Sequence, residues 1–297
     1  MDMMKSPEKL FLKLRNSLPI ELSYVSYYKN IIYLKDINNH KYTLYIFNKK
    51  QSKIINSLAK SKYILKPIYI YKENNDIYYL YEDIINKSSD ISLSKDILIA
   101  LKNIFKEFSF KNELDKYQAS LLQSLFKVLN NRFTSLEFRI RELELKPKKY
   151  DLEWVILSKY HTILDARIYL YDLESDIFKM IDKKETIEFG LIFKDISSNN
   201  YKNGLVEPNF DVYYGPIGMM LARYYLALNH SIKDDEFIKV FKDIDTFNKK
   251  YFLFMTLYCL IINVTLDFKI TNTNTSMFLN YTHQISRIIK KFGEFAK

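Results

Sequence analysis

The sequence predicts an α+β protein in which a small antiparallel sheet with one helix precedes a large helical region. Between residues 20 and 84, apolar and aromatic side chains alternate with polar ones, which is the period of strands with one buried face. From residue 95 almost to the end, apolar side chains recur at helical spacing. The change of period near residues 85–94 predicts two domains, a β-rich one over 1–85 and a helical one over 86–297.

The N-terminal region begins with a predicted helix over 7–17, because Ser6 suits the N-cap, Pro7 suits the first helical position, and Pro19 ends the helix. Asn38 and Asn39 tolerate the left-handed conformations that a tight hairpin needs. The elements that follow are one long strand or two short strands over 20–36, a turn over 37–40, a strand over 41–47, a helix over 49–63, and a hairpin of strands over 64–71 and 77–84.

The C-terminal region reads as helices, with one short β-like segment over 187–193. Pro147 marks a break between two of the helices. The most apolar stretch, 251–264, is too short to span a bilayer and predicts a buried helix. The predicted helices cover 95–108, 113–131, 134–144, 152–183, 216–230, 234–246, 248–265 and 274–296.

The composition is that of a folded chain, and it limits the classes of partner that the chain would bind. The 297 residues are 48% hydrophobic and carry a net charge of +10, which attracts acidic partners. The lysines are interleaved with acidic residues, however, and the sequence shows no nucleic-acid module signature. One cysteine, Cys259, excludes an intramolecular disulfide, and the N-terminus lacks the apolar core of a signal peptide. These features predict a cytoplasmic protein without a transmembrane segment.

The stretch from 191 to 225 is the most informative, because it holds three of the five glycines and two separated aspartates. Asp195 is followed five positions later by Asn200, in "FKDISSNN". Asp211 closes "PNFD", and "GPIGMMLARYY" follows from Gly215. Carboxylate and amide oxygens are the ligands that magnesium takes from proteins at phosphoryl-transfer sites.

This stretch resembles the catalytic and metal-binding segments of the aminoglycoside phosphotransferase and choline kinase families, and of related kinase-like proteins of bacterial spore coats. Those families carry H-x-D-x-x-x-x-N, then I-D-F-D/E, often followed by G-P and D-L-A. The resemblance implies a protein-kinase-like bilobal fold, with a small antiparallel β N-lobe containing one helix and a large helical C-lobe. It also implies an ATP and magnesium site between the lobes, and it adds a spore-associated setting to the cytoplasmic one.

Carried over by position, the resemblance gives Asp195 the role of the catalytic aspartate, which accepts or orients the proton of a substrate hydroxyl. Asn200 and Asp211 take the places of the magnesium ligands. The segment at Tyr81 and Glu82 resembles the hinge whose backbone groups bind the adenine edge.

Several positions depart from the family pattern. Phe193 stands where the families have histidine, and Asn209 stands where they have the principal magnesium-binding aspartate. Met220 replaces the aspartate of D-L-A, and Tyr45 replaces the lysine that binds the nucleotide phosphates. The helix predicted over 49–63 has no acidic residue to pair with such a lysine. Lys194, within the loop, is a candidate stand-in for the missing charge.

These departures favour a pseudokinase that binds a small molecule or a protein partner in the cleft, with weak or no use of ATP and magnesium. In this interpretation, Asp195 and Asp211 serve as turn caps. Two alternatives stay open. One is an active ATP-dependent kinase that phosphorylates a hydroxyl of an amino alcohol, aminoglycoside or sugar. The other is a basic helical protein that binds nucleic acid.

Overall fold

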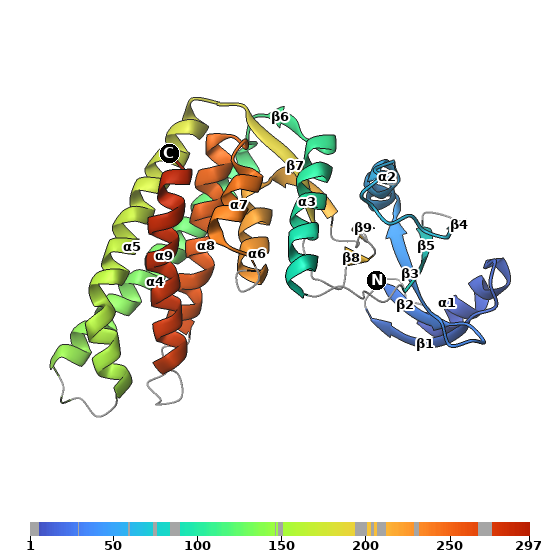
Figure 1. Cartoon of the computed structure of the whole chain (residues 1–297), viewed down its shortest axis with the longest axis horizontal. Helices are drawn as coiled ribbons and strands as arrows, with labels where there is room; N and C mark the ends of the chain where they lie inside the picture. The colour runs from blue at the N-terminus through green and yellow to red at the C-terminus, as the bar shows by residue number, and fades with distance from the viewer. Residues whose placement is uncertain are drawn as a thin grey trace. The chain divides into compact units, whose positions relative to one another are not determined.

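The chain forms two compact units. One comprises Met1–Phe108 and Leu191–Gly215, and the other comprises Ser109–Gly190 and Pro216–Lys297. The boundary predicted between residues 85 and 86 remains a prediction. The computed structural model (Figure 1) describes residues 6–28, 30–58, 60–73, 76–83, 90–145, 147, 151–193, 201–202, 205–206, 212–228, 232–266 and 275–297.

The first unit is built around a five-stranded antiparallel sheet with the order β1-β2-β3-β5-β4. The region predicted as one or two strands over 20–36 is two strands. The sheet and the helices of both units confirm the predicted α+β class. The strands are β1 (Ser23–Tyr28), β2 (Ile31–Lys35), β3 (Lys41–Asn48), β4 (Tyr69–Glu73) and β5 (Asp76–Glu82).

Local side chains fix the start of this unit as the sequence predicts. Helix α1 (Pro7–Leu14) begins after Ser6, whose hydroxyl accepts a hydrogen bond from the backbone N–H of Lys9 at 3.3 Å. In the turn between β2 and β3, Asn39 has a φ of 62°, in the left-handed region that asparagine tolerates. The Asp36 carboxylate accepts hydrogen bonds there from the backbone N–H groups of Asn38 and His40, at 2.8 and 2.9 Å.

The two faces of the sheet are both buried, by different partners. One face packs with α1 in an apolar cluster that includes Phe11, Leu34 and Leu44. Helix α2 (Lys49–Leu58) contacts β3 and β5 and is shorter than the predicted 49–63. Its Ile55 packs in a cluster with four aromatic side chains of β3 and β5, which we call the aromatic cluster. The aromatic cluster consists of Tyr45, Phe47, Tyr79 and Tyr81.

Further elements of this unit are α3 (Asp90–Phe108) and two strands of two residues each, β8 (Tyr201–Lys202) and β9 (Leu205–Val206). The backbone N–H of Leu65 donates to the Val206 carbonyl at 2.8 Å, and the Val206 N–H donates to Tyr63 at the same distance. The sequence did not predict β8 or β9, because two residues are too few to show an alternating pattern.

The second unit is mainly helical, and its helices pack around an aromatic core. Rings of Tyr225, Phe237, Phe252 and Phe292 lie with centroids 4.9–6.1 Å apart. Where 113–131 and 134–144 were predicted as separate helices, the chain forms a single helix, α4. The helices are α4 (Lys116–Leu145), α5 (Asp151–Asp182), α6 (Gly218–Leu228), α7 (Asp234–Phe241), α8 (Thr246–Leu266) and α9 (Thr275–Phe295).

A three-stranded sheet has the order β10-β7-β6, and its middle strand, β7 (Ile187–Phe193), confirms the predicted β-like segment. Its neighbours, β6 (Phe110–Asn112) and β10 (Val212–Pro216), were not predicted as strands. The stretch over 251–264 lies in α8 and is largely buried, as predicted. Among the described helices, none has both the length and the apolar character needed to cross a bilayer.

Candidate functional site

The position that the resemblance gives to a nucleotide-binding lysine lies on β3 and is occupied by Tyr45. The side chain of Tyr45 is 5% exposed. Its ring stacks on Phe47 with the centroids 5.8 Å apart, and it meets the edge of Tyr81 at 5.5 Å and an interplanar angle of 86°. Phe47 in turn meets Tyr79 at 5.2 Å. Tyr45 is therefore a packed member of the aromatic cluster.

A hydrogen bond between two uncharged side chains also joins α2 to the sheet. Tyr79 is directly opposite Tyr45 in the β3–β5 ladder. Its hydroxyl donates a hydrogen bond to the side-chain oxygen of Asn56. Burial raises the pKa of Tyr79, so its hydroxyl remains a proton donor at neutral pH. Sequence reasoning missed this pair, although the absence of acidic residues from 49–63 already excluded an ion pair from that helix.

The predicted hinge lies at the end of β5. Tyr81 points its side chain into the aromatic cluster and is 1% exposed, whereas the side chain of Glu82 is exposed. The N–H of Asp83 donates to the Lys41 carbonyl at 2.8 Å, so these two residues form a hydrogen-bonded pair. Because hydrogen-bonded and non-hydrogen-bonded pairs alternate in an antiparallel ladder, the backbone N–H and C=O of Glu82 point away from β3. On that side, β4 begins at Tyr69, opposite Leu80.

The predicted catalytic and metal-binding residues lie outside the residues that the structure describes. These are Asp195, Lys194, Asn200 and Asp211, and the same holds for Asn209. Their roles remain predictions.

Besides Tyr45, two departures from the family pattern lie within the described residues, and both are core side chains. Phe193, at the position of the family's histidine, ends β7 and is 2% exposed. Met220, at the position of the later aspartate, lies in the first turn of α6 and is also 2% exposed. Apolar side chains buried to this extent contribute packing and provide no charge or proton-transfer group.

A buried amide, Asn248, ties β7 to the starts of α6 and α8. Its Nδ2 donates to the Glu188 carbonyl and to the Asp245 carboxylate, both at 2.8 Å, and its Oδ1 accepts from the Gly218 N–H at 2.9 Å. Asp245 caps α8 by accepting from the Asn248 N–H at 2.7 Å. A Cβ on Gly218 would lie 2.5 Å from the Asn248 carbonyl oxygen, so this contact requires glycine.

The Glu188 side chain beside this junction carries a perturbed carboxyl group. Burial, reinforced by the nearby Asp245 carboxylate, raises the pKa of Glu188. Its Oε2 has no hydrogen-bond partner among the described residues. The junction was not visible in the sequence, because Asn248 and Asp245 are separated from Glu188 by about sixty positions.

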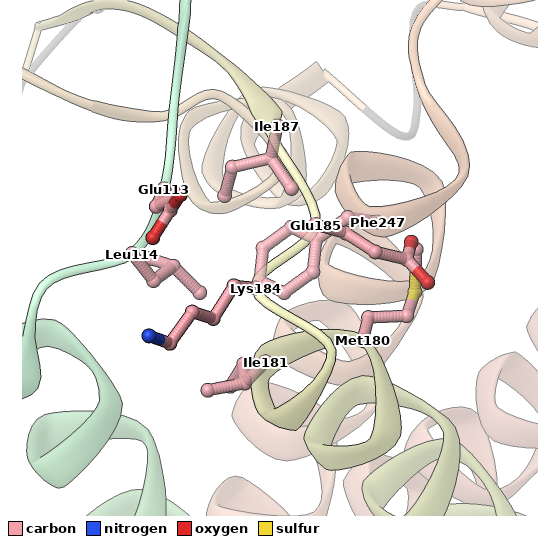
Figure 2. A pocket seen from close by; sticks show the side chains of 8 residues that line it. All are labelled: Glu113, Leu114, Met180, Ile181, Lys184, Glu185, Ile187 and Phe247. Atoms are coloured by element: carbon pink, nitrogen blue, oxygen red, sulfur yellow. The ribbon is translucent and has the colours of Figure 1, made fainter.

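The small pocket at the end of α5 is neither a metal centre nor a ligand-binding cavity. Figure 2 shows side chains around it, among them Leu114, Ile181 and Phe247. Its volume is about 20 Å³, which is room for one water molecule and far below the size of ligand pockets. In the part of the chain that the structure describes, His, Cys, Asp and Glu residues form no group of three or more that would hold a metal ion.

Comparisons with known proteins establish the fold. No protein-family profile and no curated protein matches the chain. Among solved structures, an aminoglycoside phosphotransferase from Alicyclobacillus acidocaldarius matches with a TM-score of 0.52 and 12% identity, over 93% of this chain and 90% of that one.

Two further structures match less closely. A spectinomycin phosphotransferase has a TM-score of 0.46 and 13% identity, over 99% and 98% of the two chains. An ethanolamine kinase from Plasmodium vivax has a TM-score of 0.39 and 15% identity, over 90% and 80%. The first match is the one of these three with a TM-score above 0.5, and it shows that the chain has the kinase-like fold of the aminoglycoside phosphotransferases, as predicted.

Proposed function

We propose that this chain is a pseudokinase: a kinase-like protein that binds a small molecule or a protein partner and does not turn over ATP. The observation that supports this most strongly is the burial of Tyr45 in the aromatic cluster, at the position of the nucleotide-binding lysine.

Phosphoryl transfer requires positive charge close to the transferred group, because catalysis rests on positioning and on neutralising the developing negative charge. A buried tyrosine at the lysine position supplies no such charge. The ring contacts of Tyr45 with Phe47 and Tyr81 also fill the space that a lysine side chain would need in order to reach a phosphate.

The other departures support the same proposal. Phe193 and Met220 are buried apolar side chains, so neither position supplies a polar catalytic group. Asn209, at the position of the main magnesium ligand, would offer one neutral oxygen in place of a carboxylate, which lowers affinity for a hard divalent cation. Losing the lysine and the main metal ligand together removes most of the charge that ATP chemistry uses.

A second candidate is an active small-molecule kinase, with Asp195 as the base and with Asn200 and Asp211 holding magnesium. One observation favours it. The backbone groups of Glu82 point away from β3, beyond the end of β4, which suits the binding of an adenine edge. In that case Lys194 would supply charge that Tyr45 does not.

The two candidates differ in how the protein responds to nucleotide. We expect millimolar ATP and magnesium to shift the thermal unfolding midpoint equally in the wild type and in Asp211→Ala, because a ligand stabilises a protein only when it binds the folded state. The matched variants are Asp211→Ala and Lys194→Ala. A magnesium-dependent rise in the midpoint that disappears in Asp211→Ala would favour the active kinase over the pseudokinase.

A further inference from the structure

We propose that a groove between α5 and α9 binds a small anion that carries two or more phosphate groups. The groove has a volume of about 420 Å³, within the range of small-ligand pockets. It belongs entirely to the helical unit, and none of its residues takes part in the kinase resemblance. Its lining includes three cations, a histidine and two hydroxyl groups, contributed by Lys159, Thr162, His283, Ser286, Arg287 and Lys290.

Helical spacing collects these side chains on one surface. His283, Ser286, Arg287 and Lys290 stand at positions i, i+3, i+4 and i+7 of α9, which places them on one face of the helix. Lys159 and Thr162, three positions apart on α5, line the groove from the other helix, and Thr282 of α9 completes the lining.

The helix α9 lies alongside α5 (Figure 1), and the two helices contact one another. A Cβ on Gly293 would lie only 3.1 Å from the Tyr169 hydroxyl, so the absence of a side chain at Gly293 permits this close approach of α9 to α5. The groove therefore lies between two helices that are held firmly together.

The protein's own carboxylates do not neutralise all of the positive charge in the groove. No carboxylate lines it. Within the described residues, neither Lys159 nor Lys290 makes an ion pair or a hydrogen bond. Like charges gathered around one groove repel one another unless an anion is bound. A ligand with several negative oxygens would remove that repulsion and would accept hydrogen bonds from the hydroxyl groups as well.

Arg287 is held in a fixed orientation at the groove. Its Nη2 donates to the Tyr225 hydroxyl at 2.9 Å, and its Nε lies 3.5 Å from the Asp234 carboxylate. Burial, helped by the hydrogen bond to Asp234, raises the pKa of Tyr225, so the hydroxyl stays protonated. It donates a hydrogen bond to the Asp234 carboxylate at 2.7 Å. A guanidinium positioned in this way loses little conformational freedom when it binds a phosphate.

The chemistry of the lining favours phosphate groups over other anions. A single carboxylate carries one charge and would leave one of the two lysines unmatched. Asp234 offsets part of the charge of Arg287 from outside the groove, which still leaves Lys159 and Lys290. A diphosphate or triphosphate has the charge and the number of acceptor oxygens to contact both lysines and the hydroxyl groups at once.

The test is a calorimetric titration of the full chain with inorganic tripolyphosphate, in EDTA and about 0.1 M salt, where the Debye length is about 10 Å. We expect saturable binding of one ligand per chain. The variant Lys159→Gln/Lys290→Gln should weaken it about tenfold or more, because each charged hydrogen bond is worth at least about one kcal/mol.

The matched control is Lys127→Gln/Lys239→Gln, which removes the same charge from exposed positions on α4 and α7 and should change the affinity less than about twofold. Thermal midpoints of both variants verify folding. Asp211→Ala should bind like the wild type, which separates this groove from the nucleotide site of the proposed function.

Three results would overturn the proposal. They are the absence of saturable binding to the wild type, equal weakening by the groove variant and the control variant, and loss of binding in Asp211→Ala. An oligonucleotide that competes with tripolyphosphate and is weakened equally by both lysine pairs would also count against the groove, since it would indicate a diffuse basic surface.

Discussion

Tyr45→Lys restores the side chain that the family resemblance expects, and we predict that it destabilises the protein without creating ATP binding. The structure supplies the reason. The ring of Tyr45 is almost fully buried between Phe47 and Tyr81, so the substitution removes aromatic contacts from the core. It also brings an ammonium group beside α2, which has no acidic residue.

The magnitude follows from two contributions. Removing a buried aromatic ring costs about 3–5 kcal/mol, of which the methylene stem of lysine recovers about 1–2 kcal/mol. Leaving a buried polar group unpaired adds about 1–3 kcal/mol, and the ammonium limits this cost by losing its proton or reaching solvent. The total loss is about 2–7 kcal/mol, a large fraction of the stability of a typical domain.

The assay is urea unfolding of the wild type, Tyr45→Lys and Tyr45→Phe, with calorimetric titration of each by magnesium-ATP. Tyr45→Phe keeps the ring and serves as the control, with an expected loss of about 1 kcal/mol. If Tyr45→Lys were as stable as Tyr45→Phe and bound ATP more tightly than that control, the position would face a nucleotide pocket, and the reasoning from the aromatic cluster would be refuted.

Three further predictions concern the junction at Asn248. Asn248→Ala leaves the Gly218 N–H and the Glu188 carbonyl without their side-chain partner, and should lower the free energy of unfolding by about 3–5 kcal/mol in urea; a loss below about 1 kcal/mol would show that water replaces the amide. Gly218→Ala places a Cβ 2.5 Å from a backbone oxygen and should lower the free energy of unfolding by about 3 kcal/mol. Gly215→Ala, where the nearest atom is 3.4 Å away, should lower it clearly less. Equal losses of stability in the two variants would contradict this. The pKa of Glu188 is raised in the folded state, so the charged carboxylate destabilises the protein above that pKa. Glu188→Gln should therefore be more stable than the wild type at pH 7. This advantage should vanish as the pH falls to about 4, where the carboxyl group of the unfolded chain is also protonated. An advantage that does not depend on pH would indicate a cause other than charge.

The sheet of the first unit could be predicted because period and turn residues agree there. Alternation from 20 to 84 indicated the strands, and Asn39 adopts the left-handed conformation expected of the turn. Strands of two or three residues, such as β6 and β9, are too short to show a period and form only because other segments pair with them. The predicted gap in α4 is closed because Leu129, Phe133 and Leu136 continue the buried face of the helix through it.

At the candidate site the sequence predicted one strand but not the packing around it. The strand predicted over 41–47, which carries Tyr45, is β3. Alternation indicates which face a side chain takes, but it cannot show that Tyr45, Phe47 and Tyr81 pack into one cluster, because their contacts join different strands. The groove between α5 and α9 could not be predicted for the same reason, since Lys159 and the two cations of α9 are more than a hundred positions apart in the sequence.

The central claim is that the chain keeps a kinase-like fold without ATP turnover. The most direct measurement is ADP release by the purified protein at millimolar ATP and magnesium, alone and with amino alcohols, aminoglycosides and sugars. The account predicts that ADP forms no faster than it does with Asp195→Asn. Faster ADP formation by the wild type, abolished in Asp195→Asn, would contradict it.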